Sequence, residues 1–218
     1  MKFLKWKILT ATSLVCLLPI LFGLALWDNL PDTMAIHFDV YGNPDNFVSK
    51  GFVVFGLPVM MALLQFFCCV INDVNAWKFG DRTKLELVTK WIIPIMSVVL
   101  QIITLGYGMG WNIDVRKAVA FLVGCIFIVI GNYLPKFSHI KNYDVETQKA
   151  RKINRFVGIL SVVMGILYFI SIFLPPIATV ICLFLMIPYA IVYTILWFII
   201  ILGFYIIGIP IGIGTGVM

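Results

Sequence analysis

Residues Ile8 to Trp27 have the sequence ILTATSLVCLLPILFGLALW, which is 20 residues long and carries no charge. Because a helix rises about 1.5 Å per residue, about 20 residues cross the hydrocarbon core of a bilayer. Lysines precede this run, as in a signal peptide, but the apolar core of a signal peptide is usually only about 7–15 residues long. We therefore predict that the run is a membrane-spanning signal anchor.

Apolar runs of similar length continue along the chain. They are Phe52 to Ile71, Trp91 to Gly110, Ala118 to about Pro135, Phe156 to Leu174, and a last run that starts near Ile177. The pair Pro175-Pro176 separates the last two runs, because a proline pair cannot continue a helix without losing backbone hydrogen bonds. The runs predict an all-α fold, a polytopic helical membrane protein with about six transmembrane helices.

The C-terminal run leaves a second topology open. Ile177 to Pro210 would extend about 51 Å as a helix, which exceeds the hydrocarbon thickness by roughly 20 Å. This length fits one long tilted helix, a span followed by an interfacial or re-entrant piece, or a seventh span with a turn near Pro188 or Gly203. The glycines from Gly208 onward should end any helix.

The composition agrees with a membrane protein. Hydrophobic residues make up 62% of the 218 residues and charged residues 12%, against about 45–50% and about 25% in soluble domains. These values exclude an ordinary soluble enzyme, a disordered chain and a nucleic-acid-binding domain, so the net charge of +6 does not indicate a nucleic-acid partner. All five cysteines lie in apolar runs, which favours neither disulfides nor a zinc site.

The distribution of basic residues orients the chain, since cytoplasmic loops carry an excess of Lys and Arg. With the N-terminus in the cytoplasm, thirteen basic residues lie inside: Lys2, Lys5, Lys7, Lys78, Arg82, Lys84, Lys90, Lys136, Lys141, Lys149, Arg151, Lys152 and Arg155. Only Lys50, Arg116 and Lys117 then lie outside. We predict a cytoplasmic N-terminus. For the cluster Lys149, Arg151, Lys152 and Arg155 we predict contact with anionic membrane lipids, with docking of a cytoplasmic protein partner as the alternative.

The predicted spans contain no Asp, Glu, Lys, Arg or His. Their main polar side chains are Gln65, Gln101 and Asn132, and we expect the two glutamines to hydrogen-bond to neighbouring helices. The sequence contains no catalytic arrangement, so we expect no enzyme activity and no cofactor. A small permease or exporter subunit, lined by these three side chains, remains the alternative from another functional class.

The external loop, residues 28–51, has its own structural pattern. Ala35 to Tyr41 alternate in polarity, which indicates an extended segment, and Gly42 to Asp45 are typical turn residues. Ser49 is placed to cap the second helix. Together, His37, Asp39 and Asp45 offer one nitrogen and two carboxylates, but their spacing matches no common metal motif, so we predict no metal site.

At these loops the sequence resembles a bacterial family. The external segment is similar to the N-terminal membrane domain of unknown function that precedes the SdpI module. The matching residues are Leu30-Pro31, Ile36 and His37, Gly42 and Asp45, Ser49-Lys50, and Pro58 in the next span. The second half resembles the SdpI module through Gly131-Asn132-Tyr133-Leu134-Pro135-Lys136 and Asn154-Arg155-Phe156-Val157-Gly158. It lacks the family's Gly-Ile-Arg-Thr-Pro-Trp run, and Asn154 replaces the customary His.

The resemblance implies an immunity protein of the bacterial plasma membrane, which protects a producing cell from its own secreted toxic peptide. It also implies signalling, in which the occupied membrane protein holds a transcriptional repressor at the membrane. We accordingly divide the chain into three parts. They are a two-span domain at 1–72, a third span with its loops at 73–117, and an SdpI-like module with an apolar tail at 118–218.

Two sets of residues follow as candidate sites. For the ligand-facing outer side they are His37, Asp39, Gly42, Asp45 and Lys50. For the inner side, which would meet the cytoplasmic partner, they are Asn132, Lys136 and Arg155. Asn132 is expected to pair with backbone or with a neighbouring helix near the interface.

Overall fold

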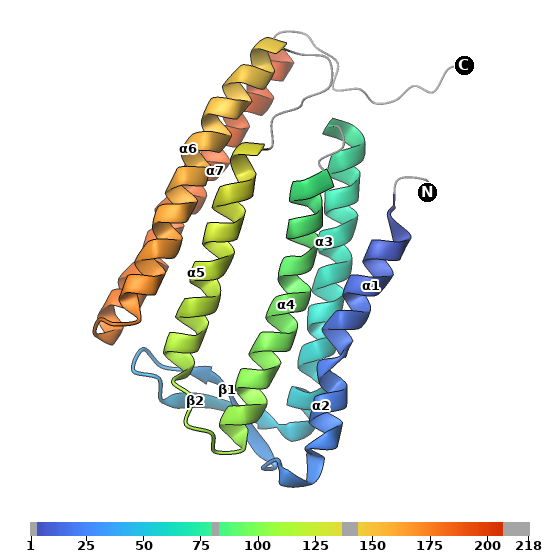
Figure 1. Ribbon diagram of the computed structural model, residues 1–218, viewed down its shortest axis with the longest axis vertical. Helices are drawn as coiled ribbons and strands as arrows, with labels where there is room; N and C mark the ends of the chain where they lie inside the picture. Colours follow the sequence, from blue (N-terminus) through green and yellow to red (C-terminus); the bar gives the residue numbers. More distant parts are fainter. Residues whose placement is uncertain (1–3, 80–82, 137–143, 207–218) are drawn as a thin grey trace.

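The structure is a computed structural model that describes residues 4–79, 83–136 and 144–206. Within these ranges six helices are long and apolar enough to cross a membrane, which confirms the predicted polytopic helical fold. Figure 1 shows them running side by side along the long axis of the molecule. They span Trp6–Ala25, Phe52–Ala76, Lys84–Gly108, Val115–Lys136, Arg151–Ser171 and Pro176–Leu196.

The first span consists of two helices, α1 (Trp6–Leu17) and α2 (Pro19–Ala25). The break falls at Pro19, which has no N–H to donate to the preceding turn. A short 3-10 helix η1 (Trp27–Asn29) leads to strands β1 (Thr33–Phe38) and β2 (Pro44–Ser49), and the second span opens with the π-helical segment η2 (Phe52–Gly56).

The other helices follow in chain order. They are α3 (Leu57–Phe79), α4 (Thr83–Gly108), α5 (Val115–Tyr133), the 3-10 turn η3 (Leu134–Lys136), α6 (Asp144–Ser171) and α7 (Pro176–Ile206). The predicted break at Pro175-Pro176 is confirmed, since α6 ends before it and α7 begins at Pro176. Helix α7 continues through Pro188 and Gly203, so no turn lies at either residue. The glycines from Gly208 onward lie outside the described residues.

The helices form two groups, which Figure 1 shows side by side. Helices α1, α3 and α4 pack on one another, and α5, α6 and α7 form the second group, which meets the first where α5 contacts α4. The β-hairpin lies across the end of the bundle where α2 and α4 meet the outer loop. The starts of α1, α4 and α6 lie toward the opposite end, as the predicted orientation requires.

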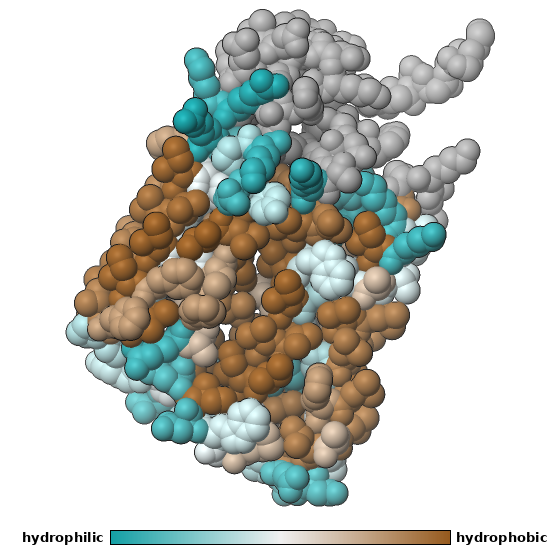
Figure 2. Space-filling view, viewed as in Figure 1, coloured by the Kyte–Doolittle hydropathy of each residue, from teal (hydrophilic) through white to brown (hydrophobic). Residues whose placement is uncertain are grey.

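The surface in Figure 2 is apolar over the middle of the molecule, and hydrophilic side chains gather toward its two ends. Large apolar side chains are exposed along every span, such as Leu21 (63%), Phe67 (60%) and Phe184 (64%). In a soluble protein such a belt would be a large exposed apolar patch, whereas in a bilayer it contacts lipid. The distribution supports the multi-pass assignment.

The inner connection between the second and third spans differs from the sequence prediction. We expected residues 72–90 to be a loop containing Lys90, but α3 continues to Phe79 and α4 starts at Thr83. The expectation that no span contains a charge is therefore wrong, because the observed spans include Asp73, Glu86 and Lys90. Their ion pairs form only after the helices pack, which a hydropathy profile does not show.

Candidate functional site

The external loop folds into a two-stranded antiparallel hairpin, which confirms the predicted extended segment and turn. The strands pair Thr33 with Ser49 and Met34 with Val48, and the register shifts near His37. Gly42 occupies the turn with a φ of +90°, a conformation that residues with a side chain rarely adopt. The Ser49 hydroxyl accepts a hydrogen bond from Phe52 N at 3.3 Å, which confirms the predicted cap.

Asp39 organises the tip of this hairpin. Its carboxylate accepts hydrogen bonds from the backbone N–H groups of Tyr41 (2.9 Å) and Asn43 (2.8 Å) and from the Asn43 side chain (3.1 Å). The hydrogen bonds from Asn43 lower the pKa of Asp39, because they favour the charged carboxylate. Asp39 is thus bonded to the turn that contains Gly42.

We expect the tip to lose order as the pH falls. A carboxyl group whose folded pKa is lowered stabilises the fold above its ordinary pKa, and the contribution disappears as the pH falls through the folded pKa. Hydrogen exchange at Tyr41 and Asn43, corrected for intrinsic rates, should therefore accelerate on acidification. Asp39→Ala should show fast exchange already at neutral pH.

A matched control for the tip is Asp32→Ala, because Asp32 is 94% exposed and pairs with Lys50 at the other end of the hairpin. This variant should leave exchange at Tyr41 and Asn43 unchanged. Equal exchange rates in the Asp39→Ala variant and the parent at neutral pH would contradict the role of Asp39.

The other predicted outer residues form two separate pairs. His37 Nδ1 lies 2.6 Å from Asp45 Oδ1, and both side chains face solvent with 68% and 45% exposure. Lys50 Nζ lies 3.0 Å from Asp32 Oδ1 and 5.2 Å from the centre of the Trp27 ring. In the structure, His37 thus pairs with Asp45, whereas Asp39 bonds to the turn that contains Gly42. Lys50 lies apart from both, at the base of the hairpin. Among the described residues no three His, Cys, Asp or Glu side chains gather as metal ligands.

The hairpin is attached firmly to the first helix group. Leu30 and Met34 belong to a buried apolar cluster with Val53, Val54 and Leu105. A Cβ added at Gly108 of α4 would collide with Met34 Cε, so glycine permits this close contact. The hairpin is therefore packed directly against η2 and α4.

At the opposite end of the bundle, residues 131–136 and residues 154–158 come together. A Cβ added at Gly131 of α5 would lie 2.6 Å from the carbonyl oxygen of Gly158 in α6. A Cβ at Gly158 would in turn lie 2.7 Å from Gly131 O and 2.8 Å from the Pro135 ring. A second close contact joins Gly124 to Gly165 seven residues away along each helix. The backbones approach closely because these positions have no side chain, as is common between membrane helices.

The predicted partner residues lie on the surface around this contact. Asn132, Lys136 and Arg155 are all exposed, and Lys136 Nζ lies 4.6 Å from the centre of the Tyr133 ring. The expectation that Asn132 is paired is not met in the described part of the chain, where its side chain faces outward from α5. Gly131 and Gly158, not Asn132, join the helices here.

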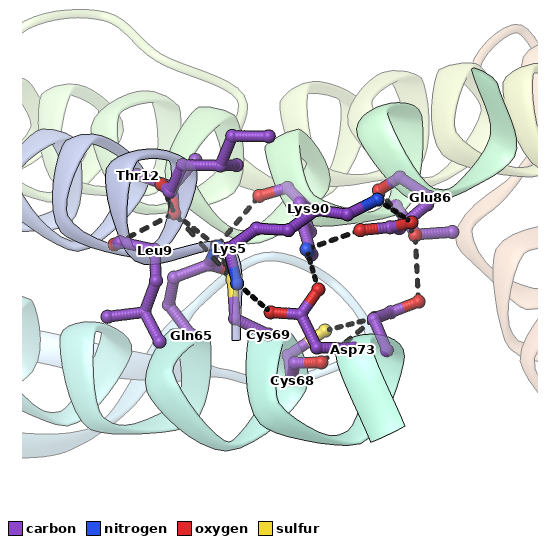
Figure 3. Close-up of polar contacts among 12 residues, drawn as sticks. Lys5, Leu9, Thr12, Gln65, Cys68, Cys69, Asp73, Glu86 and Lys90 are labelled. Atoms are coloured by element: carbon purple, nitrogen blue, oxygen red, sulfur yellow. Dashed lines mark hydrogen bonds and ion pairs between the residues drawn. The ribbon is translucent and has the colours of Figure 1, made fainter. Parts of the chain in front are cut away.

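The largest feature that sequence analysis missed is a buried charge cluster at the inner ends of α1, α3 and α4 (Figure 3). Lys90 Nζ bonds to Asp73 Oδ1 at 2.5 Å and to Glu86 Oε1 at 2.6 Å. Lys5 donates its backbone N–H to Asp73 Oδ2 at 3.1 Å and its ammonium to Glu86 Oε2 at 2.8 Å. Among the described residues, two cations and two carboxylates therefore balance in charge, and the side chains of Asp73, Glu86 and Lys90 are 0–4% exposed.

A layer of hydrogen bonds lies next to the charge cluster. Gln65 Nε2 donates to Thr12 Oγ1 at 2.8 Å and to the Lys90 carbonyl at 2.8 Å, and it lies 3.1 Å from Cys69 Sγ. Gln65 is fully buried. The predicted contact of this glutamine with neighbouring helices is confirmed.

Two further hydrogen bonds connect the three helices toward the outer side. Ser97 of α4 donates to the Cys16 carbonyl at 3.0 Å, next to the break in the first span. Gln101 donates to the Val53 carbonyl in the π-helical segment at 2.9 Å, which confirms its predicted role.

A local signal for the cluster is present in the sequence. Glu86 and Lys90 are four residues apart, a spacing at which opposite charges pair on a helix. Asp73 follows the predicted end of its span by two residues. The partner in α1 could not be inferred, because Lys5 is 81 residues from Glu86.

Comparison with known proteins identifies part of the chain. Residues 14–62 match the domain of unknown function DUF1648. The match covers the outer part of the first span, the whole hairpin and the start of α3, so all five predicted ligand-facing residues lie within the DUF1648 region. The charge cluster and the contact of α5 with α6 lie outside it. No curated protein and no solved structure matches the chain significantly.

Proposed function

We propose that this polytopic membrane protein is an SdpI-like immunity and signalling protein of the bacterial plasma membrane. In this proposal its outer hairpin meets a secreted toxic peptide, and its inner surface holds a cytoplasmic regulator such as a transcriptional repressor. The main support is the direct contact between Gly131 and Gly158. These residues belong to the two separate segments that resemble the SdpI module, and the fold brings both segments to one end of α5 and α6.

The outer hairpin supports a peptide ligand. Residues 28–51 contain four aspartates and one lysine, so the loop attracts a cationic chain. Tyr41 (74%) and Phe47 (55%) are exposed in the same hairpin as the pair formed by His37 and Asp45, so the hairpin offers both apolar and charged surface. A rigid element of this kind binds with less loss of conformational entropy than a flexible loop.

The inner end supports an acidic partner. Exposed basic side chains on η3 and α6 lie beside the Gly131–Gly158 contact, and they are Lys136, Arg151, Lys152 and Arg155. Anionic lipid headgroups satisfy the same charges when no protein is bound. A regulator with an acidic face would displace lipid at this surface.

The polar side chains on which a permease would depend have other roles. Gln65 and Gln101 donate to Lys90 O and Val53 O of neighbouring elements, and Asn132 faces outward from α5. They therefore form no continuous polar path through the described helices. We accordingly propose a role without transport and without catalysis.

The proposal is tested by the survival of a sensitive Gram-positive host challenged with secreted bacteriocin-like peptides. Expression of the parent should raise the inhibitory concentration of one peptide at least tenfold. The variant H37A/D45A should lose most of this protection, because it removes the exposed ion pair of the hairpin. Asp28→Ala is a matched control, since it removes one aspartate of the same loop outside the two strands.

Membrane abundance must be equal in all strains. Protection that persists in H37A/D45A would show that this pair does not meet the peptide. Absence of protection by the parent against every peptide would contradict the immunity proposal itself.

A further inference from the structure

The four-charge cluster formed by Lys5, Asp73, Glu86 and Lys90 has no part in the proposed contacts with peptide or regulator. Charged residues within membrane spans are expensive and usually functional. We propose that the Lys5 corner of this cluster is a latch, which holds the inner segment of the first span on α3 and α4 and opens when the outer hairpin is displaced. The inference rests on the proposed function only for the event that opens the latch, which is displacement of the hairpin by a bound peptide. The latch itself is defined without a ligand.

The two lysines of the cluster are not equivalent. Lys90 has no exposed side-chain surface and bonds to both carboxylates. Its ammonium group therefore cannot leave the carboxylates without becoming a buried, unpaired charge. The Lys5 side chain is 38% exposed, and water can replace its partner when it leaves. Lys5 is therefore the member that can be released.

Release of Lys5 would change the cluster abruptly. Asp73, Glu86 and Lys90 alone have a net charge of −1, and a buried uncompensated charge is strongly unfavourable. The carboxylates must then be hydrated, which requires α1 to move far enough for water to enter. The arrangement consequently favours a closed and an open state over intermediate positions.

The first span has a joint that permits such a movement. The segment α2 is fixed to the outer core, since a Cβ at Gly23 would lie 2.6 Å from Val54 Cγ1. Pro19 separates α2 from α1 and removes a backbone hydrogen bond at that point. The inner segment α1 can therefore tilt about Pro19 while α2 remains in place.

The contact between α1 and α3 is also incompletely packed. A groove of about 410 Å³ lies between them, and its lining includes Ser13, Leu17, Val59 and Phe66. Two buried oxygens of this contact, Ser13 Oγ and Gln65 Oε1, find no hydrogen-bond partner among the described residues. A well-packed, fully bonded interface would resist displacement, whereas this one has a groove beside Ser13 and two unsatisfied buried oxygens.

Native cysteines report the state of the latch. Cys69 is fully buried in the contact of α1 with α3, 3.7 Å from Thr12 Oγ1. Cys182 is buried in the second helix group. We would prepare variants that retain only Cys69 or only Cys182, with the other cysteines changed to Ser, and measure their reaction with a soluble maleimide in membrane vesicles without peptide.

Lys5→Ala should increase the labelling rate of Cys69 at least tenfold, and Lys5→Glu should increase it further. Lys5→Arg retains the cation that pairs with Glu86 and should leave the rate within about threefold of the parent. Lys7→Ala and Lys7→Glu make the same charge changes at an exposed residue of α1 and should have no effect. The labelling rate of Cys182 should stay constant throughout.

The coupling between the hairpin and the latch is tested with variants at the hairpin end of the bundle. Gly108→Leu places a side chain against Met34 and should displace the hairpin, raising the labelling rate of Cys69 at least threefold. Gly51→Leu is its control, because nothing lies within 4 Å of a Cβ at that position.

Several results would overturn the latch. They are a Cys69 labelling rate equal to that of the parent in both Lys5→Ala and Lys5→Glu, fast Cys69 labelling in Lys5→Arg, or a parallel rise at Cys182 that reports general unfolding. An unchanged rate in Gly108→Leu would overturn the coupling to the hairpin. A negative result in the protection assay would not change the expected labelling rates. The immunity proposal and the latch proposal can therefore fail separately.

Discussion

Lys90→Met should lower the free energy of unfolding by about 3–5 kcal/mol, because removal of one partner leaves a buried charge uncompensated. In this variant Asp73 and Glu86 share only Lys5, and the cluster has a net charge of −1. The change keeps an unbranched side chain of similar length, so lost packing contributes little. Unfolding in mild detergent titrated with dodecyl sulfate, followed by circular dichroism, would measure the difference.

A second variant separates charge from shape. The double change K90M/E86Q leaves one cation and one carboxylate, Lys5 and Asp73, and should recover at least half of the lost stability. Lys84→Met is the matched control, since Lys84 is exposed near the start of α4, and it should change stability by less than about 0.5 kcal/mol. A loss below about 1 kcal/mol in Lys90→Met would refute the electrostatic role of the cluster.

Gly158→Ala should separate α5 from α6 and lower stability by about 1–3 kcal/mol, the usual cost of inserting atoms into a packed contact. The new Cβ would lie 2.7 Å from the Gly131 carbonyl oxygen and 2.8 Å from the Pro135 ring, and neither the backbone nor a proline ring can turn aside. Under the proposed function, protection of the host should fall together with stability. The same detergent titration and the survival assay would measure both effects.

Gly51→Ala is the control for this prediction, since a Cβ there meets nothing within 4 Å. It should leave both unfolding and protection unchanged. If Gly158→Ala has the stability of the parent, the helices can move apart without cost, and the contact between Gly131 and Gly158 loses its structural importance.

Local properties of the chain were predicted well. The length of an apolar run and the stop at Pro175-Pro176 depend only on neighbouring residues, so the six spans followed from the sequence. The alternation at Ala35 to Tyr41 and the turn at Gly42 predicted the hairpin for the same reason. Gln65 and Gln101 were correctly expected to bond to other helices, because a buried amide in a membrane has few alternatives.

Contacts between distant residues were not predicted. Lys90 was assigned to a loop because it is charged, and only the packing of α1, α3 and α4 shows that its charge is balanced. Gly131 and Gly158 were noted within motifs, yet their contact depends on how two helices pack. His37 and Asp45 were both predicted to lie on the ligand-facing outer side, but the sequence did not indicate that the hairpin register would place them 2.6 Å apart.

The helical hairpin made by α3 and α4 has a consequence for biogenesis. Asp73 lies within one span and its main partner Lys90 within the next, so α3 alone would present an unpaired carboxylate to lipid. Such a helix inserts less readily than its apolar length suggests, since charges raise the cost of leaving the translocon. Insertion is favoured once α4 has been synthesised, and the two helices should enter the bilayer together. Ribosomes stalled before Lys90 should therefore hold nascent chains in which α3 is still beside the translocon.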